Sequence, residues 1–186
     1  MEPVDLIARM AAKTPDMEAV GVSSVEGLDG ADAALMLAGL DRGPYLLARV
    51  KYAGELDSQA DLETVLWHEM VKVAADRGWR RYGDGLPRAF LRNLSHMAVD
   101  EIINPCKCSA CGGRGSVYPR GKAARVCDVC LGTGSGRVSG SARARQAGID
   151  KSNWCRLWAG RYAIFLNRLD GWERVLQAHG DARLKA

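Results

Sequence analysis

Cysteines are the residues of this 186-residue chain whose spacing is best suited to chemistry. Four of the six cysteines form two copies of the pattern C-x-x-C-x-G-x-G, one at Cys108 and Cys111 and the other at Cys127 and Cys130. Two thiolates at this spacing can bind one metal ion if the chain turns tightly beneath it, and the following glycines permit that turn. The two copies together predict one structural Zn²⁺ ion bound by four sulfurs, which leaves no coordination position open for catalysis.

The other potential ligands and nucleophiles follow no comparable pattern. Cys106 lies just before the first pair and is an alternative in register to Cys108, whereas Cys155 falls in a predicted helix, where we interpret it as a small buried apolar residue. A redox-active C-x-x-C fits poorly with two matched copies and no βαβ pattern. The three histidines lack a second histidine at metal-ligand spacing: His68, His96 and His179. We therefore expect no catalytic residue and no enzymatic activity.

Helices are expected to position these residues, because Ala and Leu are abundant and β-branched residues are scarce. The clearest helical periodicity covers residues 58–77, and a second apolar stripe covers 86–103 and stops at Asn104-Pro105. Weaker patterns cover 4–13 and 29–40, and Arg42-Gly43-Pro44 is expected to break the chain. The predicted fold class is mainly α, with an inserted four-cysteine zinc knuckle pair that contains a short β-hairpin, and with a C-terminal helix-turn-helix.

The predicted helix-turn-helix follows the cysteine segment. A short Ala-rich helix from about Ser141 is expected to end at Gly148, and a second helix is expected to begin with Asp150 or Ser152 as its cap. Apolar residues of the second helix share one face: Trp154, Leu157, Trp158, Tyr162, Phe165, Leu166 and Leu169. Near its start, the candidates for contacts with DNA bases are Lys151, Ser152, Asn153 and Arg156. The same pattern also fits an ordinary αα corner of a helical bundle.

The charge of the chain changes sign near residue 104. Residues 1–103 contain 11 basic and 17 acidic residues, a net charge of −6, whereas the remainder contains 15 basic and 5 acidic residues, a net charge of +10. Such asymmetry is typical of a polyanion-binding half joined to an acidic half with another partner. The candidates for contacts with DNA phosphates are Lys107, Arg114, Arg120, Lys122, Arg125, Arg137, Arg143 and Arg145.

These patterns predict the organisation and location of the protein. We expect an acidic helical region over residues 1–57 and a DNA-binding helical domain over 58–186, with the zinc insertion at 106–135 and the helix-turn-helix at about 139–169. No apolar run is long enough to cross a bilayer, and the acidic N-terminus lacks the basic start of a signal peptide. We therefore expect a cytoplasmic protein with no membrane partner.

A resemblance to a known family rests on the cysteine pairs and on the helix after them. Two C-x-x-C-x-G-x-G pairs about fifteen residues apart precede a helix that contains Asn153-Trp154-Cys155-Arg156 and, further on, Tyr162. Over roughly residues 86–175 the chain resembles the Q-type late-gene transcription antitermination proteins of lambdoid phages. The resemblance implies that the four cysteines of the two pairs are the zinc ligands of the family.

The resemblance also implies a function and partners inside a bacterial host cell. Such a protein binds double-stranded DNA at a phage late promoter and engages bacterial RNA polymerase through its flap region and its sigma subunit. The polymerase then reads through pauses and terminators. The family pattern does not cover the N-terminal region, and it leaves the oligomeric state open.

Two alternatives remain at the level of the sequence. A zinc-stabilised protein-interaction or chaperone-like module would share the cysteine pattern, which occurs in four copies in DnaJ-type chaperones, whereas this chain has two copies and no His-Pro-Asp. A phage regulator that binds DNA without travelling with polymerase would share every motif described.

Overall fold

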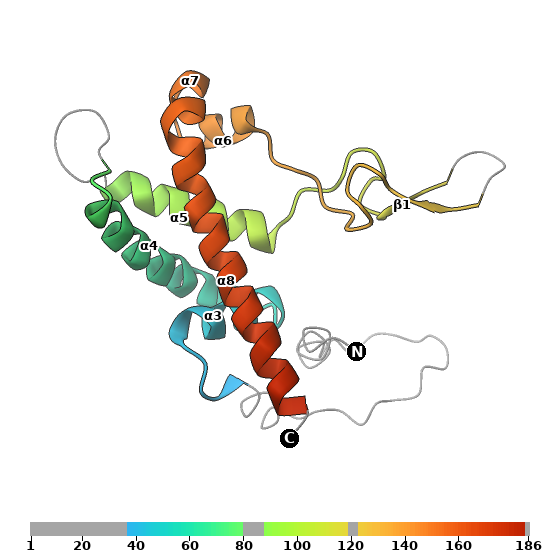
Figure 1. Ribbon diagram of the computed structural model, residues 1–186, viewed down its shortest axis with the longest axis horizontal. Coiled ribbons are helices and arrows are strands. Elements are labelled where there is room, and N and C mark those ends of the chain that lie inside the picture. Colours follow the sequence, from blue (N-terminus) through green and yellow to red (C-terminus); the bar gives the residue numbers. More distant parts are fainter. Residues whose placement is uncertain (1–36, 80–87, 119–122, 185–186) are drawn as a thin grey trace. The chain divides into compact units, whose positions relative to one another are not determined.

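The computed structural model describes residues 37–79, 88–118 and 123–184, which are mostly helical (Figure 1). The helical elements follow one another as α3 (Arg42–Lys51), η1 (Leu56–Ser58), α4 (Gln59–Asp76), α5 (Arg88–Ile103), α6 (Gly140–Gln146), α7 (Lys151–Asn153), η2 (Trp154–Trp158) and α8 (Ala159–Leu184). Between α5 and α6 lies a two-stranded antiparallel sheet of β1 (Ser116–Val117) and β2 (Arg125–Val126). The predicted mainly helical fold with a small hairpin among the cysteines is confirmed.

Some sequence predictions fall outside the described part. The predicted helix over 4–13 lies outside it, as does most of the one over 29–40. Among the helices that are described, none combines the length and the apolar character needed to cross a membrane.

The described residues form two compact units. The first contains the described residues up to Ser95 together with those from Phe165 onward, and the second is His96–Ile164. The predicted boundary between residues 57 and 58 does not coincide with this division, because α4 contacts α3 within the first unit. The sequence prediction placed α3 in the acidic N-terminal region and α4 in the following domain.

The first unit is built on the apolar faces of α3, α4, the start of α5 and the latter part of α8. The buried side chains of α4 are Leu62, Leu66, Met70 and Ala74, which recur every four residues and confirm the predicted helix over 58–77 to within a residue at each end. Polar contacts join distant segments of this unit: Glu173 of α8 accepts hydrogen bonds from Lys51 and Tyr52, and Glu69 of α4 accepts from Arg168. The half-buried Glu173 has a lowered pKa, since these bonds outweigh the opposing effect of burial.

The prediction that Arg42-Gly43-Pro44 breaks the chain is wrong. These residues form the first turn of α3, where a proline is tolerated because its missing N–H has no helical acceptor. Gly43 serves packing: a Cβ atom there would lie within 3.0 Å of three atoms of the Trp172 ring. The glycine thus allows close contact between α3 and α8 in the first unit.

In the second unit, α6 is followed by a tight turn and by α7. Gly148 has φ +68° and ends the segment, and Asp150 caps α7 by accepting a hydrogen bond from the backbone N–H of Asn153 at 2.9 Å. Of the two predicted caps, Asp150 is therefore the one observed. Both α7 and η2 contact α6.

The η2 segment is a π-helical turn, which the sequence did not predict. The backbone N–H of Ala159 bonds to the carbonyl of Trp154, five residues earlier. Trp154 and Trp158 are both buried, as the predicted apolar face requires, whereas Leu157 is 42% exposed. Leu157 was predicted on the apolar face and Cys155 was predicted to be buried, but both are exposed.

Candidate metal centre

The two cysteine motifs form a pair of similar turns on either side of the β-hairpin. We call residues 106–118 and 123–137 the knuckle pair, with the first knuckle at Cys108 and Cys111 and the second at Cys127 and Cys130. β1 and β2 pair in antiparallel register, with Ser116 opposite Val126 and Val117 opposite Arg125. The hairpin therefore brings the two knuckles to one place, because each begins or ends next to one of its strands.

The four cysteine sulfurs converge into a buried cluster. All four lie within 4.8 Å of one another, with Sγ–Sγ distances of 4.0 Å for Cys108 and Cys127 and 3.7 Å for Cys111 and Cys130. A tetrahedral ion with metal–sulfur bonds of about 2.3 Å requires sulfurs about 3.8 Å apart. None of these cysteines is in a disulfide. The arrangement thus fits a four-thiolate site that could hold one metal ion.

Glycines bring backbone N–H groups close to the sulfurs. The Gly115 N–H donates to Cys111 Sγ and the Gly134 N–H donates to Cys130 Sγ, both at 3.3 Å. Both glycines have φ +72°, a conformation that L side chains rarely adopt. N–H donors of this kind favour the thiolate form and so favour metal binding.

The knuckles also bond to each other in a reciprocal manner. The Cys108 N–H donates to the carbonyl of Gly134 at 2.8 Å, and the Cys127 N–H donates to the carbonyl of Gly115 at 2.9 Å. A Cβ on Gly115 would lie inside 3.0 Å of the Gly132 carbonyl oxygen, and one on Gly134 would lie inside 3.0 Å of the Gly113 carbonyl oxygen. Each knuckle therefore depends on glycines in the other.

The sulfurs differ in acidity. Burial alone would raise the pKa of Cys130, but the Gly134 N–H and the neighbouring thiols outweigh it and lower this pKa to about 7. The pKa of Cys108 is raised, because its burial and the other thiols outweigh the backbone N–H of Cys111. Of Cys108 and Cys130, Cys130 therefore gives up its proton more readily.

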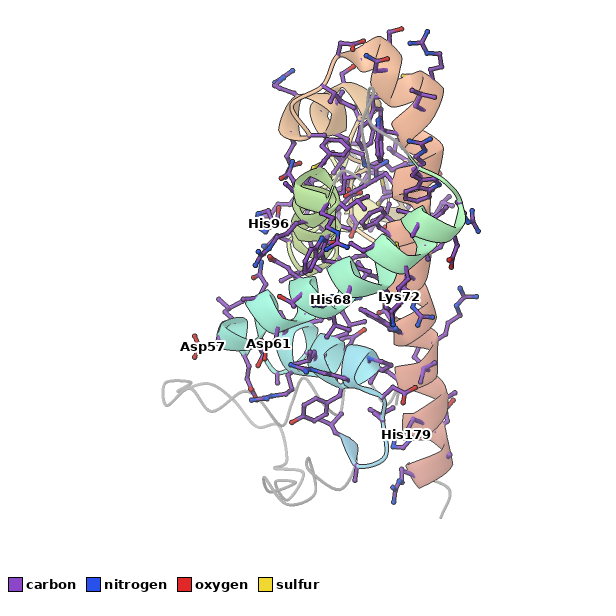
Figure 2. The ribbon with its side chains drawn as sticks, turned by 90° about the vertical axis from the view of Figure 1, so that its left-hand side faces the viewer. Asp57, Asp61, His68, Lys72, His96 and His179 are labelled. Carbon is purple, nitrogen blue, oxygen red and sulfur yellow. The ribbon has the colours of Figure 1, made fainter. Side chains whose placement is uncertain are left out.

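The fifth nearby cysteine is not part of the cluster. Cys106 is exposed and lies outside the group of four sulfurs, so Cys108 holds the position for which the two were alternatives. Within the described ranges, no other set of three or more His, Cys, Asp or Glu side chains is close enough to share a metal ion. The three histidines lie on separate helices, His68 on α4, His96 on α5 and His179 on α8 (Figure 2).

A non-glycine residue with positive φ occurs in the second knuckle and not in the first. Leu131 has φ +52° and occupies the position that Gly112, with φ +61°, holds in the first knuckle. Its side chain is 79% exposed, and three more large apolar side chains of the knuckle pair are also exposed, Tyr118, Val126 and Val129. The apolar side chains thus contribute little to an interior here, which consists of the four cysteines with Val117 packed against them.

The structure places most of the basic candidates at the surface. Exposed side chains without an ion-pair partner in the described part of the chain are Lys107, Arg114, Arg137 and Arg145. Arg125 is exposed and lies 3.5 Å from the carboxylate of Asp128. Arg120 and Lys122 fall outside the described residues. Among the candidates for base contacts, Lys151, Ser152 and Arg156 are exposed and Asn153 is partly buried.

Arg143 differs from the other basic candidates because it has an internal partner. Its guanidinium donates from Nε and Nη2 to the carboxylate of Glu101, which also accepts from the hydroxyl of Tyr162 at 3.1 Å. The guanidinium lies over the Tyr162 ring, 5.2 Å from its centroid. This network joins α5, α6 and α8 within the second unit. Sequence reasoning missed Glu101, since an acidic residue near a helix end has no spacing signal of its own.

Comparison with known proteins adds no assignment to this geometry. No model of a protein family matches the chain, and no curated protein matches it.

Proposed function

We propose that the chain is a zinc-stabilised, DNA-binding transcription antitermination factor. The observation that carries the proposal is the exposed group Lys151, Ser152 and Arg156 at the start of a helix that buries Trp154 and Trp158. This helix follows a basic segment whose interior is a cluster of four thiols. An exposed polar helix face beside a basic segment matches the requirements for base contacts and phosphate contacts.

Zinc is the ion that this donor set favours. Four thiolates at tetrahedral spacing are typical of structural zinc, whereas magnesium and calcium prefer oxygen ligands. Cys108, Cys111, Cys127 and Cys130 would hold the ion, whose role is to order the knuckle pair. We expect about one zinc per chain in protein purified under reducing conditions. A content well below that value in folded protein would contradict the assignment.

The DNA-binding arrangement assigns a role to each exposed group. In this proposal α6, the turn at Gly148 and the helix from α7 onward act as a helix-turn-helix, and the start of the second helix enters the major groove. Arg143 is left out of the phosphate contacts, because its bonds to Glu101 hold it within the unit. The exposed basic residues contact phosphates: Lys107, Arg114, Arg125, Arg137 and Arg145.

A salt titration tests the DNA step directly. If several phosphates are contacted, the affinity for duplex DNA falls steeply between 50 and 200 mM salt, and the slope of its logarithm against the logarithm of the salt concentration is proportional to the number of contacts. A double variant, Arg137→Ala with Arg145→Ala, should show a shallower dependence by about two counterions. Affinity that is independent of salt would exclude a phosphate-binding surface.

Transcription in vitro tests the antitermination step. The template carries a lambdoid late promoter followed by a terminator, and purified bacterial RNA polymerase with its sigma subunit transcribes it with and without the protein. Readthrough that depends on the protein supports antitermination. Specific DNA binding without readthrough would instead identify a DNA-binding regulator that does not act on elongating polymerase.

A protein-interaction module is the second candidate, and one observation favours it. Val126, Val129, Leu131 and Tyr118 are exposed, and a hollow in the knuckle surface is lined by Val129 and Leu131 together with Arg137. Exposed apolar groups of this kind often mark protein contacts. Under this alternative the purified protein shows no salt-dependent affinity for duplex DNA, so the titration above separates the two candidates.

A further inference from the structure

A chain of hydrogen bonds links three side chains at the exposed start of the second helix. Asp150 accepts from the backbone N–H of Asn153 at 2.9 Å, and its other carboxylate oxygen accepts from the Asn153 side-chain Nδ2. The Asn153 Oδ1 in turn accepts from Nη2 of Arg156 at 2.9 Å. Both ends of the Asn153 amide are therefore occupied by neighbours on the same helix.

This arrangement gives Asn153 and Arg156 different capacities for reading a base. An asparagine that reads adenine must offer its oxygen and its NH₂ group together. In Asn153 one N–H bonds to Asp150 and one lone pair of the oxygen accepts from Arg156, so its neighbours on the helix set the orientation of the amide. Arginine carries five N–H donors, of which one is used by Asn153. Among the described residues no second acceptor contacts the Arg156 guanidinium, so donors remain for a ligand.

The π-helical turn brings Arg156 to the surface. Trp154 and Trp158 are buried at either end of η2, and the three residues between them, Cys155, Arg156 and Leu157, are exposed. π-Helical turns often occur at functional sites, where the extra residue redirects side chains. The π-helical turn and the hydrogen bond that Arg156 donates to Asn153 thus both set the position of the Arg156 side chain.

We propose that Arg156 reads a guanine in the major groove and that Asn153, held by Asp150, is a positioning residue that orients the Arg156 guanidinium. The inference rests on the proposed DNA binding and deepens it, because it names the base and separates the two roles. Two parallel N–H donors of arginine match O6 and N7 of guanine. Orientation before binding reduces the side-chain freedom that is lost when these bonds form.

Selection from a pool of randomised DNA duplexes tests the proposal without a known binding site. The wild-type protein and the variants Arg156→Ala and Asn153→Ala each select a consensus from the same pool. We expect Arg156→Ala to lose the preference for one guanine by about 10- to 100-fold and to keep the other positions. Asn153→Ala should keep the same consensus, including every adenine, while its preference for that guanine weakens by about 3- to 10-fold.

Two further variants separate positioning from folding and from charge. Asp150→Ser keeps an oxygen that can cap the helix but removes the second oxygen that holds the Asn153 amide, so it should reproduce the effect of Asn153→Ala. Arg145→Ala removes an exposed cation that the proposed function assigns to a phosphate contact, so it should weaken binding to all sequences equally. Circular dichroism and zinc content identify any variant that fails to fold.

The outcomes distinguish this inference from the function on which it rests. Loss of an adenine preference in Asn153→Ala would make Asn153 a base reader and overturn the inference. An unchanged guanine preference in Arg156→Ala would overturn it as well, while DNA binding itself stands. If the folded wild-type protein selects no consensus and shows no salt-dependent affinity, the proposed DNA binding fails, and the inference fails with it.

Discussion

Two regions of the second unit are held together by different means. The knuckle pair has four sulfurs and the partly buried Val117 as its interior, whereas the helical region buries Trp154, Trp158 and Tyr162 together with residues of α5 and α6. Apolar burial of about 25 cal/mol per Å² stabilises large aromatic side chains without any ligand. The knuckle pair has no comparable apolar area, so under the proposed function a bound metal ion stabilises its fold. The difference indicates that one chain can contain a metal-dependent and a metal-independent region.

Metal removal should produce the largest effect and the clearest separation of the two regions. Structural zinc contributes on the order of 10–16 kcal/mol to such sites, so chelation should unfold the knuckle pair and leave most helical signal in place. Hydrogen exchange followed by mass spectrometry would show rapid exchange confined to about residues 106–137. Because the thiols must lose protons to bind metal, apparent affinity should also decrease as the pH falls, and Cys130, whose pKa is lowered to about 7, is protonated only near the acidic end of this decrease. Melting of the helices on chelation would abolish the distinction.

Truncation of the aromatic core should destabilise the helical region and leave zinc binding by the knuckle pair in place. Trp154 is buried and packs against Tyr162 with ring centroids 5.3 Å apart. Trp154→Ala should lower the free energy of unfolding of the helical region by about 3–5 kcal/mol, because a large cavity replaces the indole. Denaturant titration by circular dichroism measures the loss. Zinc content should remain near one ion per chain, and a parallel loss of zinc would indicate that the regions fold as one.

The polar network of the helical region should contribute less than its aromatic core. Glu101→Gln weakens charged hydrogen bonds to a half-buried Arg143 and should cost about 1–3 kcal/mol. Tyr162→Phe removes a single hydrogen bond to the same carboxylate and should cost about 1 kcal/mol. Thermal unfolding of the wild type and of both variants shows which variant loses more stability. Equal losses for the two would mean that the Arg143 pair adds nothing beyond the tyrosine bond.

Leu131→Gly should have the smallest effect on stability. It copies Gly112 of the first knuckle, relieves a positive φ that costs a non-glycine residue about 1 kcal/mol, and adds chain entropy of similar size to the unfolded state. The net change should lie between zero and about 1 kcal/mol of stabilisation. Gly115→Ala is the matched control, and it should weaken zinc retention because its Cβ would meet the Gly132 carbonyl. Competition with a zinc-binding dye compares the two variants.

The sequence was most informative where chemistry acts over short distances. Cys108, Cys111, Cys127 and Cys130 were predicted as one cluster because metal coordination imposes a local spacing, and the four sulfurs do converge. The α4 helix was predicted to within a residue because burial recurs along a single helix. Both signals can be read without knowing which distant segments meet.

The predictions that failed depended on contacts between distant residues or on irregular backbone. Gly43 was interpreted as a break because its neighbour in space, Trp172, lies far along the chain. Leu157 was placed inside because a regular helical period was applied across a π-helical turn. Cys155 was placed inside because free cysteines are usually buried. Arg143 was chosen as a surface cation because its partner Glu101 cannot be identified from local spacing.

The reciprocal contacts between the knuckles also limit which positions of the two motifs can change by mutation. The glycines of each knuckle leave room for carbonyl groups of the other. Replacing such a glycine by a larger residue would therefore push against the backbone of the other knuckle. The two copies therefore cannot change independently at Gly115 and Gly134. We expect differences between the two copies only at positions outside these shared contacts. Leu131 is one such difference, because it holds the motif position that Gly112 holds in the first knuckle.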